Sequence, residues 1–286
     1  MHCTLAREVD GGSSSSMRLN FLPKHETNNA KQHECSQMCP RQAHGHNLCP
    51  TSPKKIVGAV GAPRVGDIVD RWPALLMESQ VVAEFHQINN VNLRTQFYKE
   101  LDRHTPRLIT LFRDKAIKTG KTAEELAKLM RIYDIQVNFS FHMIQNYINR
   151  WFVHSLHLLR ALPVYLCEDA SKFFRTCSTL DSADGPDLTD TPLALLTVVT
   201  DDTTDSALFS PESICIVFED EILVNGPTNL GDSFLLLFGY IYALDLKYPN
   251  KLELTFTFIQ KVVICFEDNK LLKGRLLTLK NDLFNE

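Results

Sequence analysis

Residues 193–200 read LALLTVVT and residues 213–218 read SICIVF, and these two short apolar runs decide the fold class. A continuous run of apolar and β-branched residues of this length is typical of a strand that is buried on both faces. The acidic residues 219–221 predict a turn into a third strand at residues 222–224. Together these runs predict a small, mostly antiparallel sheet.

Helices are predicted after this sheet. Asn229 begins one helix through Leu246, Pro249 opens another to about Phe266, and residues 271–284 form a final basic amphipathic helix. Because these helices are segregated from the strands, the pattern predicts an α+β fold.

The segment before the sheet predicts smaller elements. Residues 161–166 (ALPVYL) predict a short strand, and Asp169 is expected to cap a helix that includes Phe173 and Phe174. Residues 181–192 predict an acidic loop.

The middle of the chain, residues 64–134, predicts a helical bundle because its apolar residues recur at helical spacing. Pro106 is expected to end the second helix of this bundle and to open the third. Thr122 and Glu125 match a capping box for the fourth helix. Residues 135–157 have neither a helical nor a strand period, and we expect them to be helical.

Residues 1–63 predict a disordered head, since they are rich in Ser, Gly, Asn and Pro and lack a periodic apolar pattern. This head contains four possible zinc ligands spaced as in a degenerate zinc knuckle: Cys35, Cys39, His44 and Cys49. The simpler interpretation is a disordered stretch that is rich in Cys and His and binds no metal. The chain therefore divides into the head, the block 64–134, a possible insertion at residues 135–157, and an α+β block at residues 158–286.

Charge separates the two halves of the chain. Up to His157 there are 20 Lys and Arg, 14 Asp and Glu, and all 10 histidines. From Leu158 onward there are 10 Lys and Arg against 20 Asp and Glu, and no histidine. Histidine, the commonest general base in enzymes, is thus absent from residues 158–286, where the apolar pattern is clearer. The basic half is compatible with an acidic partner or with nucleic acid, but its charges are spread along predicted helical faces, so an ordinary solvated surface is the simpler interpretation.

Carboxylates offer a second possible metal site. Asp201 and Asp202 follow a predicted buried strand, where they could hold Mg²⁺ for phosphoryl transfer. Clusters of Asp, Thr and Pro are also typical of turns, which is the simpler interpretation.

The sequence predicts an intracellular protein. No signal peptide or transmembrane run is evident. The four cysteines of the apolar body are expected to be ordinary buried thiols: Cys167, Cys177, Cys215 and Cys265.

Several stretches form a recognisable set: residues 65–76 (VGDIVDRWPALL), 97–112 (FYKELDRHTPRLITLF), 159–169 (LRALPVYLCED), 234–246 followed by Tyr248-Pro249, 258–268 (FIQKVVICFED) and 276–283 (LLTLKNDL). Taken together they resemble a large, mainly fish, family of uncharacterised proteins labelled sterile alpha motif domain-containing protein 3-like. The resemblance covers residues 65–134 and 158–284. It implies no activity and no catalytic residues. Residues 1–63 do not match a sterile alpha motif domain, so the oligomerisation that this label suggests does not carry over.

Residues 135–157 look inserted between the two blocks that resemble this family. A retained intron or a faulty gene model is our hypothesis for them. A peptide spanning residues 139–150 in the cellular protein would contradict it.

Three functions follow as hypotheses. The first is a non-catalytic protein–protein interaction module with an unidentified protein partner, without a cofactor or a small-molecule substrate. The second is a nucleic-acid-associated protein of mobile-element origin, which would use the basic half and zinc at the knuckle-like head. The third is a metal-dependent phosphoryl-transfer enzyme built on Asp201 and Asp202.

Overall fold

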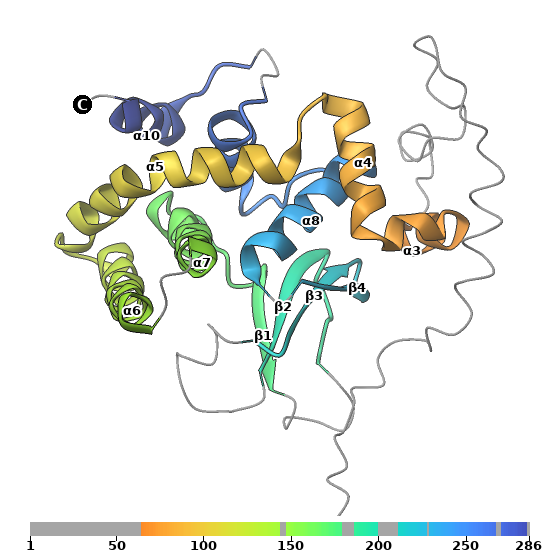
Figure 1. The fold of residues 1–286 in the computed structure, drawn as a ribbon, viewed down its shortest axis with the longest axis horizontal. Helices are drawn as coiled ribbons and strands as arrows, with labels where there is room; N and C mark the ends of the chain where they lie inside the picture. The colour runs from red at the N-terminus through yellow and green to blue at the C-terminus, as the bar shows by residue number, and fades with distance from the viewer. Residues whose placement is uncertain are drawn as a thin grey trace, which may run out of the picture.

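The computed structural model describes residues 64–143, 147–178, 186–199, 211–227, 229–266 and 270–284, with side chains at 138–143 and 147–152 left undescribed. It confirms the α+β class (Figure 1). Its elements are α3 (Val65–Arg71), η2 (Pro73–Leu76), α4 (Glu78–Asn89), α5 (Leu93–Ala116), α6 (Lys121–Met143), α7 (Tyr147–Tyr165), β1 (Phe174–Ser178), β2 (Leu193–Val199), β3 (Ser213–Phe218), β4 (Glu221–Gly226), α8 (Leu230–Ala243), α9 (Glu253–Phe258), η4 (Ile259–Val263) and α10 (Gly274–Phe284).

The four strands form one mixed sheet in the order β1-β2-β3-β4. β1 runs parallel to β2, whereas β2, β3 and β4 are antiparallel neighbours. Glu219 and Asp220 form the β3–β4 turn, and both have positive φ angles, of 49° and 69°. A two-residue turn of this kind matches the right-handed twist of its strands. The three predicted strands and their hairpin are therefore confirmed.

Both faces of β2 are buried, as its continuous apolar run predicted. Leu195 belongs to the main core on the side of the helices, together with Ile214 and Ile216 of β3. On the opposite face, a second and smaller cluster contains Ala194, Leu196, Val198, Cys215 and Val217, with Leu188 packed against it.

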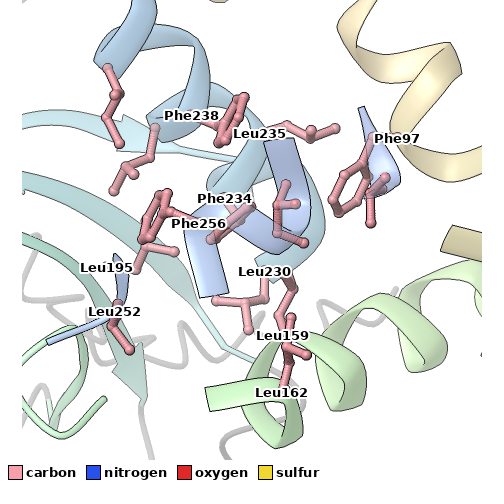
Figure 2. Close-up of a cluster of buried hydrophobic side chains, with 14 of the residues drawn as sticks. Phe97, Leu159, Leu162, Leu195, Leu230, Phe234, Leu235, Phe238, Leu252 and Phe256 are labelled. Carbon is pink, nitrogen blue, oxygen red and sulfur yellow. The ribbon is translucent and has the colours of Figure 1, made fainter. Parts of the chain in front are cut away.

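α8 is the centre of the main core. Almost all of its side chains are buried, and Figure 2 shows its phenylalanines between side chains from α5, α7, α9 and the sheet. The ring of Phe238 is nearly parallel to that of Phe256, with centroids 6.3 Å apart. A Cβ atom at Gly239 would lie 2.8 Å from Cγ1 of Val81, so a glycine here allows α4 and α8 to pack closely.

The predicted strand at residues 161–166 is wrong, because residues 161–165 continue α7 and Leu166 follows in a turn. Their apolar positions join the apolar face of the preceding turn, and Leu158, Ala161 and Leu162 are all buried in the main core. Pro163 lies near the end of α7. Its missing N–H removes one intrahelical hydrogen bond.

The predicted break at Pro106 is also wrong, since α5 runs through it. Leu101, Leu108 and Phe112 lie on one buried face that spans the proline. Burial along that face outweighs the local cost of proline. In the same turn, the Thr105 hydroxyl donates a hydrogen bond of 2.6 Å to the Leu101 carbonyl.

Two further local predictions fail. Asp169 accepts hydrogen bonds from Ser171 in a turn, but Phe174 then begins β1 rather than continuing a helix. Thr122 lies inside α6 and is not its cap, because the Glu124 amide already donates to the Gly120 carbonyl. The expectation of helix across residues 135–157 is confirmed for the described part, which belongs to α6 and α7.

Candidate functional site

The metal-site predictions are not located by the structure. Cys35, Cys39, His44 and Cys49 lie outside the described residues, and so do Asp201 and Asp202. Elsewhere, within the ranges that the structure describes, no three His, Cys, Asp or Glu side chains gather where they could hold a metal ion.

The cysteines differ from the prediction of four buried thiols. Cys167 and Cys265 are exposed, Cys177 is half-buried, and Cys215 alone of these four is buried. Cys167 and Cys265 both have a φ of 57° just after a helical segment, where the chain turns and leaves the side chain outside the core. Burial raises the pKa of Cys215 to about 11, and the thiol donates to Oδ1 of Asn225 at 3.1 Å.

A buried polar cluster joins α5 to the start of α8. The Asn229 side chain accepts a hydrogen bond from the Asp232 amide and donates one to the Asp232 carboxylate, which caps the helix. Tyr98 and Arg94 of α5 also donate to this carboxylate, each at 2.9 Å. Burial, followed by the Asp232 charge, raises the pKa of Tyr98 well above its ordinary value.

The backbone at Gly231 packs closely against this cluster. A Cβ atom at Gly231 would lie 2.7 Å from both the Ser155 and the Tyr98 hydroxyl oxygens. The carboxylate of Asp232 is 6% exposed and is held by three side-chain donors. We therefore interpret the cluster as a structural junction between α5, α7 and α8.

Two buried histidines of α7, His154 and His157, pack against Tyr133 of α6. His157 and Gln136 are hydrogen-bonded through Nε2 and Oε1 at 2.9 Å, and the Tyr133 ring meets the His157 ring edge-on. Burial lowers the pKa of His157 to about 4, helped by the charges of Arg160 and His154. A neutral imidazole is therefore the native form near neutral pH.

The surface of α10 differs from these interior clusters because it exposes apolar side chains among cations. Leu277 is 44% exposed and Phe284 is 50% exposed, while Leu271, just before the helix, is 86% exposed. Leu277, Lys280 and Phe284 lie on one side of the helix axis, because these positions are separated by three and four residues. Lys273 is exposed just before the helix, which begins at Gly274 with a φ of 54°. We call Leu277, Lys280 and Phe284, together with Lys273 just before the helix, the α10 stripe.

α10 is firmly anchored to the rest of the fold. Leu276 and Leu279 are buried in the main core. Arg107 of α5 donates to the carbonyl of Asp282 at 2.9 Å, and Arg275 donates to the carbonyl of Leu166 at 2.8 Å. The helix lies along α5 on the side away from the sheet (Figure 1). Because the core-facing side of α10 is occupied, Leu277 and Phe284 keep about half of their surface exposed, while Lys280 is half-buried.

Positive charge dominates this part of the surface. Residues 270–284 contain four cations, Lys270, Lys273, Arg275 and Lys280, against the single acid Asp282. Arg103 and Arg107, both exposed, lie on α5 close to the end of α10, where the His104 ring meets the Phe284 ring at 5.3 Å. The basic character of α10 was predicted, but its exposed apolar residues were not, since burial depends on how α10 is docked.

Comparisons with protein-family models, curated proteins and solved structures give no match to this chain. Across the part of the chain that the structure describes, no helix combines the length and the apolar character needed to cross a membrane.

Proposed function

We propose that this chain is a non-catalytic protein–protein interaction module and that the α10 stripe is its docking surface. The observation that supports this proposal is the exposure of Leu277 and Phe284 on a helix whose other side is fixed in the core. Exposed apolar side chains in a rim of cations are typical of surfaces that bind another protein. The proposal assigns neither a cofactor nor a substrate to the chain.

The nucleic-acid alternative is supported by the same cations but not by the apolar residues. Lys and Arg bind the phosphate groups of nucleic acid, whereas an exposed leucine adds little binding free energy at a phosphate backbone. The resemblance to the sterile alpha motif domain-containing protein 3-like family stays a prediction and adds no activity to either hypothesis.

An intracellular location, cytoplasmic or nuclear, forms part of the proposal. It is supported by the four described cysteines, Cys167, Cys177, Cys215 and Cys265, all of which are free thiols. Free thiols in this number are typical of a reducing compartment.

The test is affinity purification of the full chain as wild type and as the double variant Leu277→Gln/Phe284→Gln. We expect the recovery of specific protein partners to fall about tenfold in the variant, because truncating central apolar anchors weakens an interface by this order. Recovery must survive nuclease treatment. Quantitative mass spectrometry is the measurement.

The matched control is Ile117→Gln. Ile117 is 85% exposed and lies beyond the end of α5, so it tests whether any exposed apolar residue has the same effect. Partners that are equally recovered with both variants, or that disappear with nuclease, would contradict the proposal.

A further inference from the structure

On the basis of the proposed function, we infer that the partner presents a short acidic amphipathic helix, which lies along the α10 stripe. Spacing, charge and the anchoring of α10 together carry this inference. It names the chemistry of the partner, which the proposed function leaves open.

The spacing of the stripe fits a helix. Positions 277, 280 and 284 of α10 are separated by three and four residues, which is the spacing of the seam that one helix presents to another. Lys280 lies between Leu277 and Phe284 along this seam, and Lys273 precedes the helix. Seven residues separate Leu277 from Phe284, which is about 10 Å or two turns of helix.

The positive charge of the lysines indicates that the partner helix is acidic. Lys280 lies between Leu277 and Phe284 on the helix, and Lys273 adds a second cation just before it. A partner helix with apolar side chains opposite Leu277 and Phe284 and with carboxylates near the two lysines would satisfy all four side chains. Arg107 of α5 adds a cation at the end of α10, where it donates to the Asp282 carbonyl, and this charge would favour an acidic partner further. Arg103 is paired with Glu100 at 3.3 Å.

The anchoring of α10 distinguishes this partner from an anionic membrane. An amphipathic helix that binds a membrane inserts its whole apolar face among the lipids. Here Leu276 and Leu279 are buried within the protein, and Arg107 and Arg275 hold the helix at both ends. The exposed side of α10 also carries the polar residues Arg275, Thr278 and Asn281 beside Leu277 and Phe284, which suits a protein partner rather than a lipid surface.

The experiment uses a fluorescein-labelled peptide of about 15 residues, with Glu and Leu alternating at the four–three spacing on an Ala/Gln background. Fluorescence anisotropy measures its binding to the full chain at about 50 and 200 mM salt. We expect binding that weakens with salt. We expect the double variants Leu277→Gln/Phe284→Gln and Lys273→Gln/Lys280→Gln each to weaken it about tenfold.

Three controls make the result specific. Lys273→Arg/Lys280→Arg retains the charge and should retain binding, and Ile117→Gln should leave it unchanged. A peptide with Lys in place of Glu should not bind. Equal binding of the Lys peptide, or no effect of the stripe variants, would overturn the inference.

Two other probes separate the alternatives. Vesicles of phosphatidylserine and phosphatidylcholine, and a DNA duplex, are tested with the same variants. If either of these binds through the stripe while the acidic peptide does not, the inference is wrong. If the peptide does not bind but protein partners are still lost with Leu277→Gln/Phe284→Gln, the inference fails and the proposed function stands.

Discussion

At the scale of the residue, His157 shows how burial changes chemistry without creating a catalytic site. Its ring is fully buried and packs against Tyr133, with Gln136 as its hydrogen-bond partner. The cationic groups that act on it are Arg160 and, when protonated, His154, and both disfavour a second positive charge. The neutral ring is therefore part of the α6–α7 contact, and its protonation should weaken that contact.

At acid pH, the buried His157 should lower the free energy of unfolding. Between the ordinary histidine pKa and the native value of about 4, the unfolded chain binds a proton at His157 and the folded chain does not. Unfolding then takes up a proton, so stability is complete above about pH 6.5 and falls as the pH decreases toward 4. We expect His157 to account for a loss of up to about 3 kcal/mol across this window.

Urea unfolding of the wild type and of His157→Gln at several pH values measures the effect. Glutamine keeps a side chain that can bond to Gln136, and the variant should show a shallower pH dependence. His86→Gln is the matched control because His86 is exposed on α4. Equal slopes for the wild type and His157→Gln would contradict this account.

At the scale of the element, Glu168 connects two helices that are far apart in the sequence. It follows α7 and accepts hydrogen bonds from the Leu254 and Thr255 amides and from the Thr255 hydroxyl, at 2.7, 2.8 and 2.6 Å. These groups lie in the first turn of α9, where backbone N–H groups lack intrahelical partners. The carboxylate thus caps α9 from outside and fixes it against the end of α7.

Replacing Glu168 by Ala should lower the free energy of unfolding by about 1–2 kcal/mol, because a charged cap is lost from a helix start. Chemical denaturation monitored by circular dichroism is the measurement. Asp169→Asn is the control, since Asp169 is an exposed neighbour whose partners are Ser171 and Lys251 rather than α9. An equal effect of both variants would show that the cap has no special role.

At the scale of the whole molecule, one apolar core includes both the helical block and the sheet. Val81 and Phe97 belong to the same cluster as Leu195 and Phe234. Phe97 and Phe234 have ring centroids 6.4 Å apart, although 137 positions separate them in the sequence. The early helices therefore complete their core only against α8.

This continuity predicts one cooperative unfolding transition for residues 64–286. Near-ultraviolet and far-ultraviolet circular dichroism should give the same denaturant midpoint, which is the usual test of two-state behaviour. A fragment of residues 64–134 should lack a stable fold, because Val81, Phe85 and Phe97 would lose their partners on α8. Two separate transitions, or a cooperatively folded 64–134 fragment, would contradict the prediction.

The sequence was sufficient where local pattern and burial agree. The runs at β2 and β3 predicted strands, Asn229 predicted the start of α8, and residues 219–221 predicted a hairpin turn, which the structure places at residues 219–220. These elements are determined locally, because an apolar run, a cap and a turn each depend on a few adjacent residues.

Tertiary packing decided the rest. α5 continues through Pro106, and residues 161–165 are helical, because burial along a shared face outweighs local signals that are typical of a break and a strand. Likewise, the leucines of α10 looked alike in the sequence. Docking on α5 buries Leu276 and Leu279 and leaves Leu277 outside. The basic amphipathic helix was therefore determined by the sequence, whereas its outward stripe exists only because the fold covers the other side.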